Sequence, residues 1–174
     1  MIIIDTVKTV KVLRASFWGV PSVLDESPAV LRTAGLSKRI RKEVIFDDIF
    51  PAFPKGKVTA ITGQNGAGKT ALAQILCGLA RQTRGHILID GEKARAAGRR
   101  REIYHCGIFS GRRILILDDP TSGLDGQNMR LIAERLRSEA RNGRTILVIT
   151  HDRELIESCC DNVVEVGTRP SEEQ

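Results

Sequence analysis

Short apolar runs alternate along the chain with segments whose apolar positions recur at helical spacing. The runs predict strands at residues 8–13, 44–46, 58–61, 86–89, 114–117, 145–150 and 163–166. Helices are expected at 71–76, 127–141 and 153–160, and the second carries Met129, Ile132, Ala133, Leu136 and Ala140 on one face. Strands that are apolar throughout and alternate with helices predict an α/β fold, with a mostly parallel sheet covered by helices on both faces.

A phosphate-binding loop is predicted between strand 58–61 and helix 71–76. The run Gly63-Gln64-Asn65-Gly66-Ala67-Gly68-Lys69-Thr70 fits G-x-x-x-x-G-K-[ST] without a mismatch. A loop at a helix N-terminus offers backbone N–H groups and the positive end of the helix dipole to a phosphate chain. Lys69 is placed to reach the β- and γ-phosphates, and the Thr70 hydroxyl to ligate Mg²⁺. The alternative is a glycine-rich turn that ends in Lys-Thr by chance.

A carboxylate for the metal follows the strand at 114–117. Asp118 comes directly after this apolar run, and the carboxyl ends of parallel strands meet at one edge of a sheet. The phosphate loop opens at the same edge, so Asp118 is the expected Mg²⁺ partner, directly or through water. The alternative role for Asp118 is to cap the following turn.

Composition narrows the class of protein. The 174 residues suit one domain, the net charge is +6, and no apolar run is long enough to span a bilayer. Cys77, Cys106, Cys159 and Cys160 lack the paired spacings of a zinc site, and the start of the chain does not resemble a signal peptide, which favours a cytoplasmic protein. The basic segment 93–113 is interpreted as solvated surface, with nucleic-acid contact as the alternative.

Two further motifs accompany the phosphate loop and Asp118. Ser122-Gly123-Leu124-Asp125 follows Asp118 closely, and His151 comes directly after the strand at 145–150. In this order the four elements resemble the ATP-binding cassette (ABC) ATPases, whereas other P-loop classes such as small kinases do not explain the last two. The resemblance implies a P-loop NTPase fold that binds ATP and Mg²⁺. It further implies that Ser122, Gly123, Leu124 and Asp125 form a dimer interface, that His151 contacts the γ-phosphate, and that Asp119 stands at the catalytic base position.

The chain is most similar to the second ATPase half of duplicated energy-coupling factor transporter proteins, over residues 36–91 and 110–166. The specific stretches are 64–70, 113–125 with Asn128-Met129, and 148–152 with Cys159-Cys160-Asp161. The resemblance implies a strand and linker-like segment at 1–30, an ABC-type domain at 31–170 and a tail at 171–174. The expected partners of the chain are a second ABC ATPase subunit or half and a membrane transporter subunit. The chain itself is expected at the inner face of the cell membrane, without direct insertion.

The chain also departs from this family. Only 49 positions separate Lys69 from Asp118, and no glutamine occurs between Gln82 and Gln127. The glutamine loop, the helical subdomain and the signature motif are therefore expected to be missing, through an internal deletion near residues 105–108. Asp119 replaces the usual glutamate, which moves the base back by about one bond length. Ile40 stands where an aromatic side chain usually stacks on adenine.

Two functional hypotheses follow besides nucleic-acid contact. The first is an ATP-binding subunit or fragment of an ABC or energy-coupling factor transporter, with weak or no hydrolysis. The second is a catalytically impaired module that binds nucleotide and pairs with an intact ATPase, favoured by the missing signature and by Asp119.

Overall fold

A six-stranded, all-parallel sheet forms the centre of the protein. The computed structural model describes residues 11–13, 29–94, 103–105 and 112–166. In spatial order the strands are β1 (Lys11–Leu13), β11 (Asn162–Glu165), β5 (Val58–Thr62), β10 (Thr145–Ile149), β9 (Ile114–Asp118) and β8 (Ile103–His105). The predicted α/β fold with a parallel sheet is therefore confirmed.

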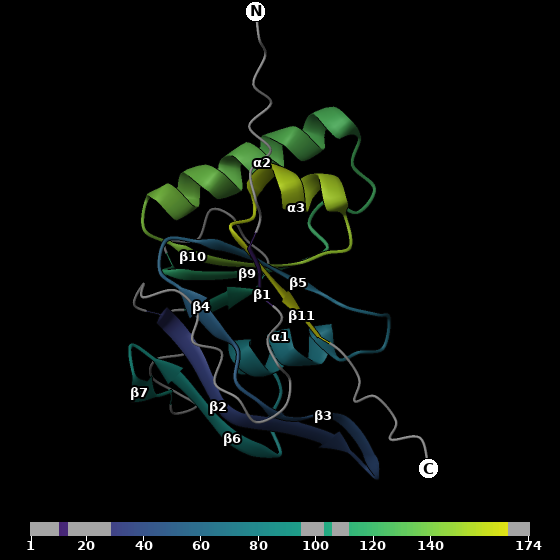
Figure 1. Cartoon of the computed structure of the whole chain (residues 1–174), viewed down its shortest axis with the longest axis vertical. Helices are drawn as coiled ribbons and strands as arrows, with labels where there is room; N and C mark the ends of the chain where they lie inside the picture. Colours follow the sequence, from purple (N-terminus) through teal and green to yellow (C-terminus); the bar gives the residue numbers. More distant parts are fainter. Residues whose placement is uncertain (1–10, 14–28, 95–102, 106–111, 167–174) are drawn as a thin grey trace, which may run out of the picture.

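Helices cover both faces of this sheet, as Figure 1 shows. Helix α1 (Lys69–Cys77) lies on one face, and α2 (Gly126–Arg141) and α3 (Arg153–Cys159) lie on the other. Alternate residues of β9 enter two separate cores: Ile114 and Ile116 pack on the α1 side, and Leu115 and Leu117 on the α2 side. Burial on both faces explains why the strand is apolar at every position.

A second, antiparallel sheet packs beyond α1 and was not predicted. Its order is β3 (Glu43–Ile49), β2 (Ala29–Ile40), β6 (Arg84–Ile89) and β7 (Glu92–Lys93), and β4 (Ala52–Pro54) also pairs with β2. The sequence gives no clear period for β2 because its register shifts between Ala34 and Ser37, around Gly35. Gly35 has φ +58°, and a Cβ on the facing Gly85 would lie 2.2 Å from the Gly35 carbonyl oxygen. The irregularity therefore depends on two glycines in close contact.

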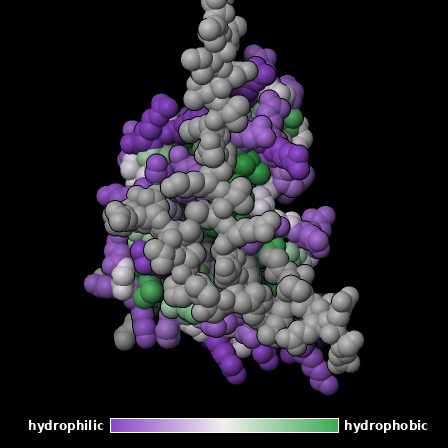
Figure 2. Space-filling model, viewed as in Figure 1, coloured by the Kyte–Doolittle hydropathy of each residue, from purple (hydrophilic) through white to green (hydrophobic). Residues whose placement is uncertain are grey.

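The apolar face predicted for the long helix is confirmed. Met129, Ala133, Leu136 and Ala140 are buried, and Ile132 is half-buried against the same core. The opposite face of α2 is rich in charged side chains, which contribute to the hydrophilic surface at the top of Figure 2. Among the described residues, no helix has both the length and the apolar character needed to cross a membrane.

Strand β8 is a further element that the sequence pattern did not reveal. It pairs in parallel with β9, with Ile103 opposite Ile114 and His105 opposite Ile116. Only residues 106–113 connect the two strands. A crossover between parallel neighbours ordinarily takes about a dozen residues or more, usually with a helix. These eight residues are therefore too few for a helical crossover of the ordinary kind.

The N-terminal predictions are tested only in part. The strand expected at 8–13 is present as β1, which adds to the edge of the parallel sheet beside β11. The linker-like segment lies mainly outside the described residues, and the tail at 171–174 lies wholly outside them. The division into 1–30, 31–170 and 171–174 therefore stays a prediction.

Candidate functional site

The predicted phosphate loop connects the carboxyl end of β5 to the first turn of α1. Gly68 occupies the N-cap of α1 with φ +90°, and no side chain caps this helix end. The first N–H groups of α1 therefore need another acceptor, which a phosphate chain supplies. Gln64, Asn65 and Gly66 are exposed, while Ala67 is buried and anchors the loop.

Gly63 and Gly68 bring the loop close to neighbouring elements. A Cβ on Gly63, where φ is +141°, would lie 2.1 Å from the Val166 carbonyl oxygen. A Cβ on Gly68 would lie 2.5 Å from Ile45 Cγ2. Any other residue type would have to displace the Val166 backbone at the first position or the Ile45 side chain at the second. The two glycines are therefore required by packing as well as by backbone conformation.

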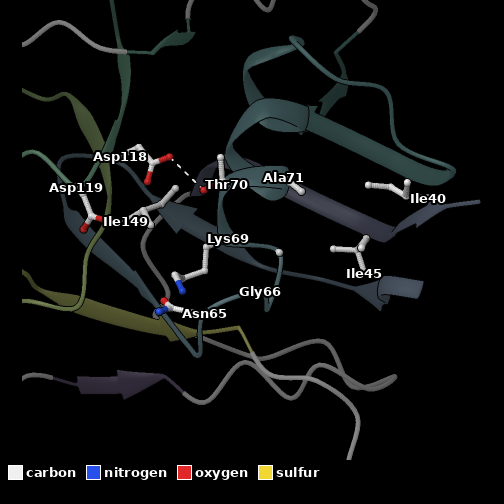
Figure 3. Close-up of a pocket in the computed structure, with 11 residues that line it drawn as sticks. Ile40, Ile45, Asn65, Gly66, Lys69, Thr70, Ala71, Asp118, Asp119 and Ile149 are labelled. Carbon is white, nitrogen blue, oxygen red and sulfur yellow. Dashed lines mark hydrogen bonds between the residues drawn. The ribbon is translucent and has the colours of Figure 1, made fainter. Parts of the chain in front are cut away.

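Lys69 extends its side chain back over the loop. Its ammonium donates hydrogen bonds to the carbonyl oxygens of Gly63 at 2.8 Å and Gln64 at 2.9 Å. The charge is thereby held against the loop, in the lining of the cavity that phosphates would occupy (Figure 3). An ammonium has three donors, so one remains to contact a phosphate oxygen.

The two residues predicted to bind the metal are brought together. The Thr70 hydroxyl donates a hydrogen bond to Asp118 Oδ2 at 3.2 Å, drawn as the dashed line in Figure 3. Asp118 ends β9, in register with Ile149 of β10, which in turn lies opposite Ile61 of β5. A hydroxyl and one carboxylate are the hard oxygen ligands that Mg²⁺ takes when phosphates and water complete its octahedron. The residues present therefore fit this ion. No cluster of three or more metal-ligating side chains occurs among the described residues.

Asp119 and His151 face each other at the same edge of the sheet. His151 Nδ1 lies 3.5 Å from Asp119 Oδ1; the His151 side chain is 88% exposed and that of Asp119 46%. The Asp119 N–H donates to the Ile149 carbonyl oxygen at 2.9 Å, and its φ is +43°. Aspartate tolerates this left-handed conformation better than most residues because its short side chain can bond locally.

The segment 122–125 forms a tight turn between β9 and α2. The Ser122 N–H donates to the Asp119 carbonyl oxygen, and the Leu124 N–H donates to that of Thr121. Ser122, Gly123 and Leu124 are exposed, and Leu124 is one of few large apolar side chains that are. Asp125 has a role that the sequence pattern did not indicate: its carboxylate accepts from the Asn128 N–H at 2.8 Å and caps α2.

Part of the phosphate loop, Thr70, Asp118 and Asp119 line a cavity of about 330 Å³, whereas His151 and the segment 122–125 do not line it. Ile40, Ile45, Ala71 and Ile149 supply its apolar lining, and Asn65, Lys69, Thr70, Asp118 and Asp119 supply its polar side chains. Ile45 was not singled out from the sequence, because its position over the loop follows only from the packing of β3 against Gly68. Figure 3 shows Ile40 and Ile45 together, on the opposite side from Asp119.

Two predictions fall largely outside the described residues. The deletion expected near 105–108 lies almost entirely in the undescribed segment 106–111. Most of the basic segment 93–113 is undescribed too, although Arg113 forms a double hydrogen bond to the Asp90 carboxylate. Nucleic-acid contact by this segment therefore stays a prediction.

Comparison with protein families gives two matches that meet in the middle of the chain. The model of the ABC transporter family matches residues 46–110. A model described as "AAA domain, putative AbiEii toxin, Type IV TA system" matches residues 103–157. The first includes the phosphate loop, and the second includes Asp118, the segment 122–125 and His151.

Three named relatives are ATP-binding proteins. A "Putative ABC transporter ATP-binding protein" of Treponema denticola is 28% identical over 181 residues, covering 69% of this chain and 37% of that protein. "Uncharacterized ABC transporter ATP-binding protein YybJ" of Bacillus subtilis is 23% identical, covering 79% of this chain and 93% of that protein. "Ribose import ATP-binding protein RbsA 3" of Rhizobium etli is 40% identical over 67 residues, covering 38% of this chain and 13% of that protein.

Solved structures share the fold. A nucleotide-free ATP-binding cassette from an ABC transporter superposes with a TM-score of 0.74 at 13% identity, over 80% of this chain and 88% of that one. The protein cbiO1 from Clostridium perfringens, part of the ABC transporter complex cbiONQ, superposes with a TM-score of 0.70 at 22% identity. The superposition covers 79% of this chain and 85% of that one. Fold and site together define a P-loop protein with the nucleotide-binding fold of ABC cassettes. More particularly, residues 46–110 are similar to the ABC transporter family, and the Treponema relative is named an ABC transporter ATP-binding protein.

Proposed function

We propose that this chain binds Mg·ATP as the ATP-binding subunit, or a fragment of it, of an ABC transporter. One observation carries the proposal: the phosphate loop, Lys69 and the Thr70–Asp118 pair line one cavity of about 330 Å³ at the carboxyl edge of the sheet. The loop amides and Lys69 would bind the phosphates. Thr70 and Asp118 would hold Mg²⁺, which neutralises phosphate charge.

The proposed chemistry beyond binding is weak hydrolysis. Asp119 would orient or deprotonate the attacking water, and His151 would contact the γ-phosphate; their separation of 3.5 Å at the edge of the cavity supports this pairing. An aspartate reaches less far than a glutamate, so the water would be held less closely. We therefore expect turnover to be slow even with a complete partner.

The proposed partners are a second ABC ATPase subunit or half and a membrane transporter subunit. The exposed turn at 122–124, with the apolar Leu124, supports an interface at this edge. The solved cbiO1 belongs to the complex cbiONQ, so a fold of this kind occurs in such an assembly. We place the chain in the cytoplasm at the inner face of the cell membrane, in a transporter related to the energy-coupling factor group.

We further propose that the middle of the domain is missing, with the glutamine loop, helical subdomain and signature motif. The alignment with the Treponema protein spans 181 positions. It includes 69% of the 174 residues of this chain, or about 120, so about 61 aligned positions have no counterpart in this chain. In the alignment with the Bacillus protein, about 65 positions likewise have no counterpart in this chain. The short connection of residues 106–113 begins within the overlap of the two family matches at 103–110, and it supports a deletion at this place.

Titration calorimetry with Mg·ATP on the full chain tests the binding proposal. We expect saturable binding that Lys69→Ala weakens at least about tenfold, because the triphosphate loses its point charge. Lys55→Ala is the matched control, since Lys55 is exposed on the turn before β5 and does not line the cavity. Absence of binding, or equal binding by the Lys69 variant, contradicts the proposal.

A second candidate function is an interaction module that binds nucleotide and pairs with an intact ATPase without turnover. The short β8–β9 connection and Asp119 favour it. Phosphate release is measured after this chain is mixed with an intact homologous ATPase. Extra turnover that disappears with His151→Ala supports a catalytic subunit, whereas unchanged turnover despite nucleotide binding supports the module.

A further inference from the structure

A groove lined by basic side chains runs along α2, beside α3 and the start of β5, on the face of the sheet away from α1 (Figure 1). This α2–α3 groove consists of two hollows, of about 260 Å³ and about 140 Å³, that share Arg137. Arg130 and Ser158 also line the larger hollow, and Lys57 and Arg141 also line the smaller one. No residue of the phosphate loop lines either hollow, so the groove is separate from the nucleotide cavity.

Three arginines of α2 form a row along this groove. Arg130, Arg137 and Arg141 are spaced so that, at about 100° per residue, they lie within about 40° of one another around the helix axis. The row extends about 16 Å, because a helix rises about 1.5 Å per residue. An extended polypeptide covers that distance with about five residues.

The positive charge of this row is mostly unpaired. Elsewhere around α2, Arg135 and Arg144 share the carboxylate of Glu139, at 2.7 Å and 2.9 Å. In the groove, by contrast, neither Arg137 nor Arg141 forms an ion pair with a described residue. Like charges four residues apart on a helix also repel each other. The groove therefore offers two cations to an anionic ligand from outside the described part of the chain.

Arg137 has an unsatisfied donor as well. Its Nε is buried and has no hydrogen-bond partner among the described residues, although its side chain lines both hollows. A buried N–H group without an acceptor is destabilising. A guanidinium binds a carboxylate best through two parallel N–H groups, and Nε with one terminal nitrogen forms such a pair. A carboxylate that entered either hollow and turned the guanidinium toward itself would supply the missing acceptor.

The lining favours carboxylates on a polypeptide over the backbone of a nucleic acid. Glu134 lines the larger hollow and Asp161 the smaller one, so the positive charge along the groove is interrupted. A nucleic acid carries closely and evenly spaced phosphates, which these two carboxylates would repel. No described residue that lines either hollow is aromatic, so bases would find no stacking surface.

We propose that the α2–α3 groove binds an acidic segment of a partner protein, with one carboxylate in each hollow and Arg137 between them. The segment needs at least two acidic side chains within about five extended residues, which matches the length of the arginine row. The interaction is electrostatic and weakens as salt is added. It does not depend on nucleotide, because the phosphate loop takes no part in it.

The test is fluorescence anisotropy of a labelled hexaglutamate peptide with the full chain at low salt. We expect saturable binding that excess Mg·ATP does not displace, and no binding of labelled hexaglutamine, which matches the peptide in size but lacks its charge. Arg137→Gln combined with Arg141→Gln should raise the Kd at least about fivefold. Arg81→Gln combined with Arg153→Gln is the matched control: it removes the same charge at two exposed arginines that line neither hollow, and should change the Kd less than about twofold.

Both double variants should keep Tm within about 2 °C of the unchanged chain, because none of the four arginines forms an ion pair with a described residue. If the groove variant loses more, Arg141→Gln alone, at an exposed side chain, replaces it and should raise the Kd at least about twofold. Absence of saturable hexaglutamate binding, or equal losses in groove and control variants, overturns the proposal. Tighter binding of a thymidine oligonucleotide of the same charge, lost in the groove variant, would assign the groove to nucleic acid and also overturn it.

Discussion

The Thr70 hydroxyl donates a hydrogen bond of 3.2 Å to Asp118 Oδ2, although 48 residues separate the two in the chain. Thr70 lies in the first turn of α1 and Asp118 at the carboxyl end of β9. The contact joins the residue that follows the phosphate-loop lysine to the strand that carries the carboxylate proposed to bind Mg²⁺. It marks the position where Mg²⁺ would bridge protein and phosphate.

Asp118→Asn should remove the contribution of Mg²⁺ to ATP affinity. The amide keeps the size of the side chain but loses the charge that favours a divalent cation. We expect ATP affinity in Mg²⁺ to fall at least about tenfold, with affinity in EDTA changed less than about threefold, measured by calorimetry. Asp90→Asn, at an exposed carboxylate paired with Arg113, is the control and should change neither. Equal losses with and without Mg²⁺ would show a role other than metal binding.

Asp119→Glu should increase hydrolysis when an intact homologous ATPase is present. The longer side chain restores the reach of the base toward the attacking water, and we expect phosphate release to rise at least about tenfold. The gain should disappear when His151→Ala is combined with it, because the two side chains lie 3.5 Å apart. Unchanged or lower phosphate release by Asp119→Glu would argue against a catalytic role for this position.

Gly85→Ala should destabilise the protein far more than Gly91→Ala. The two glycines have nearly the same φ, +82° and +80°, so the conformational cost of about 1 kcal/mol is shared. A Cβ on Gly85 also meets the Gly35 carbonyl oxygen at 2.2 Å, whereas one on Gly91 meets nothing within 4 Å. We expect at least about 3 kcal/mol of lost unfolding free energy for Gly85→Ala, measured by urea denaturation. Equal losses would show that β2 and β6 are not in close contact.

Glu139→Ala should lower stability, because Glu139 is a buried charge on α2 with two cationic partners. Its carboxylate accepts from Arg135 at 2.7 Å and Arg144 at 2.9 Å, and its side chain is 6% exposed. We expect a loss of about 2 kcal/mol, below the value for a fully buried pair because the arginines are partly exposed. The exposed Glu134→Ala is the control for thermal denaturation and should change Tm by less than about 2 °C.

The sequence alone determined the elements whose signals are local. The phosphate loop is specified by glycines, Lys69 and Thr70 within eight consecutive positions, and β9 by an apolar run that is buried on both faces. The apolar face of α2 follows from helical spacing. Each of these patterns is set by neighbours in the chain, so no knowledge of the tertiary structure was needed.

Only the tertiary structure decided the features that depend on distant segments. Strand β2 is irregular because Gly35 and Gly85 meet backbone to backbone, and Ile45 enters the cavity because β3 packs against Gly68. Asp125 caps α2 through its own side chain, which the motif it belongs to did not indicate. The short strand β8 is defined by its pairing with β9 rather than by its own sequence. Contacts between residues far apart in the chain produce no periodic pattern, so they become visible only when the chain is folded.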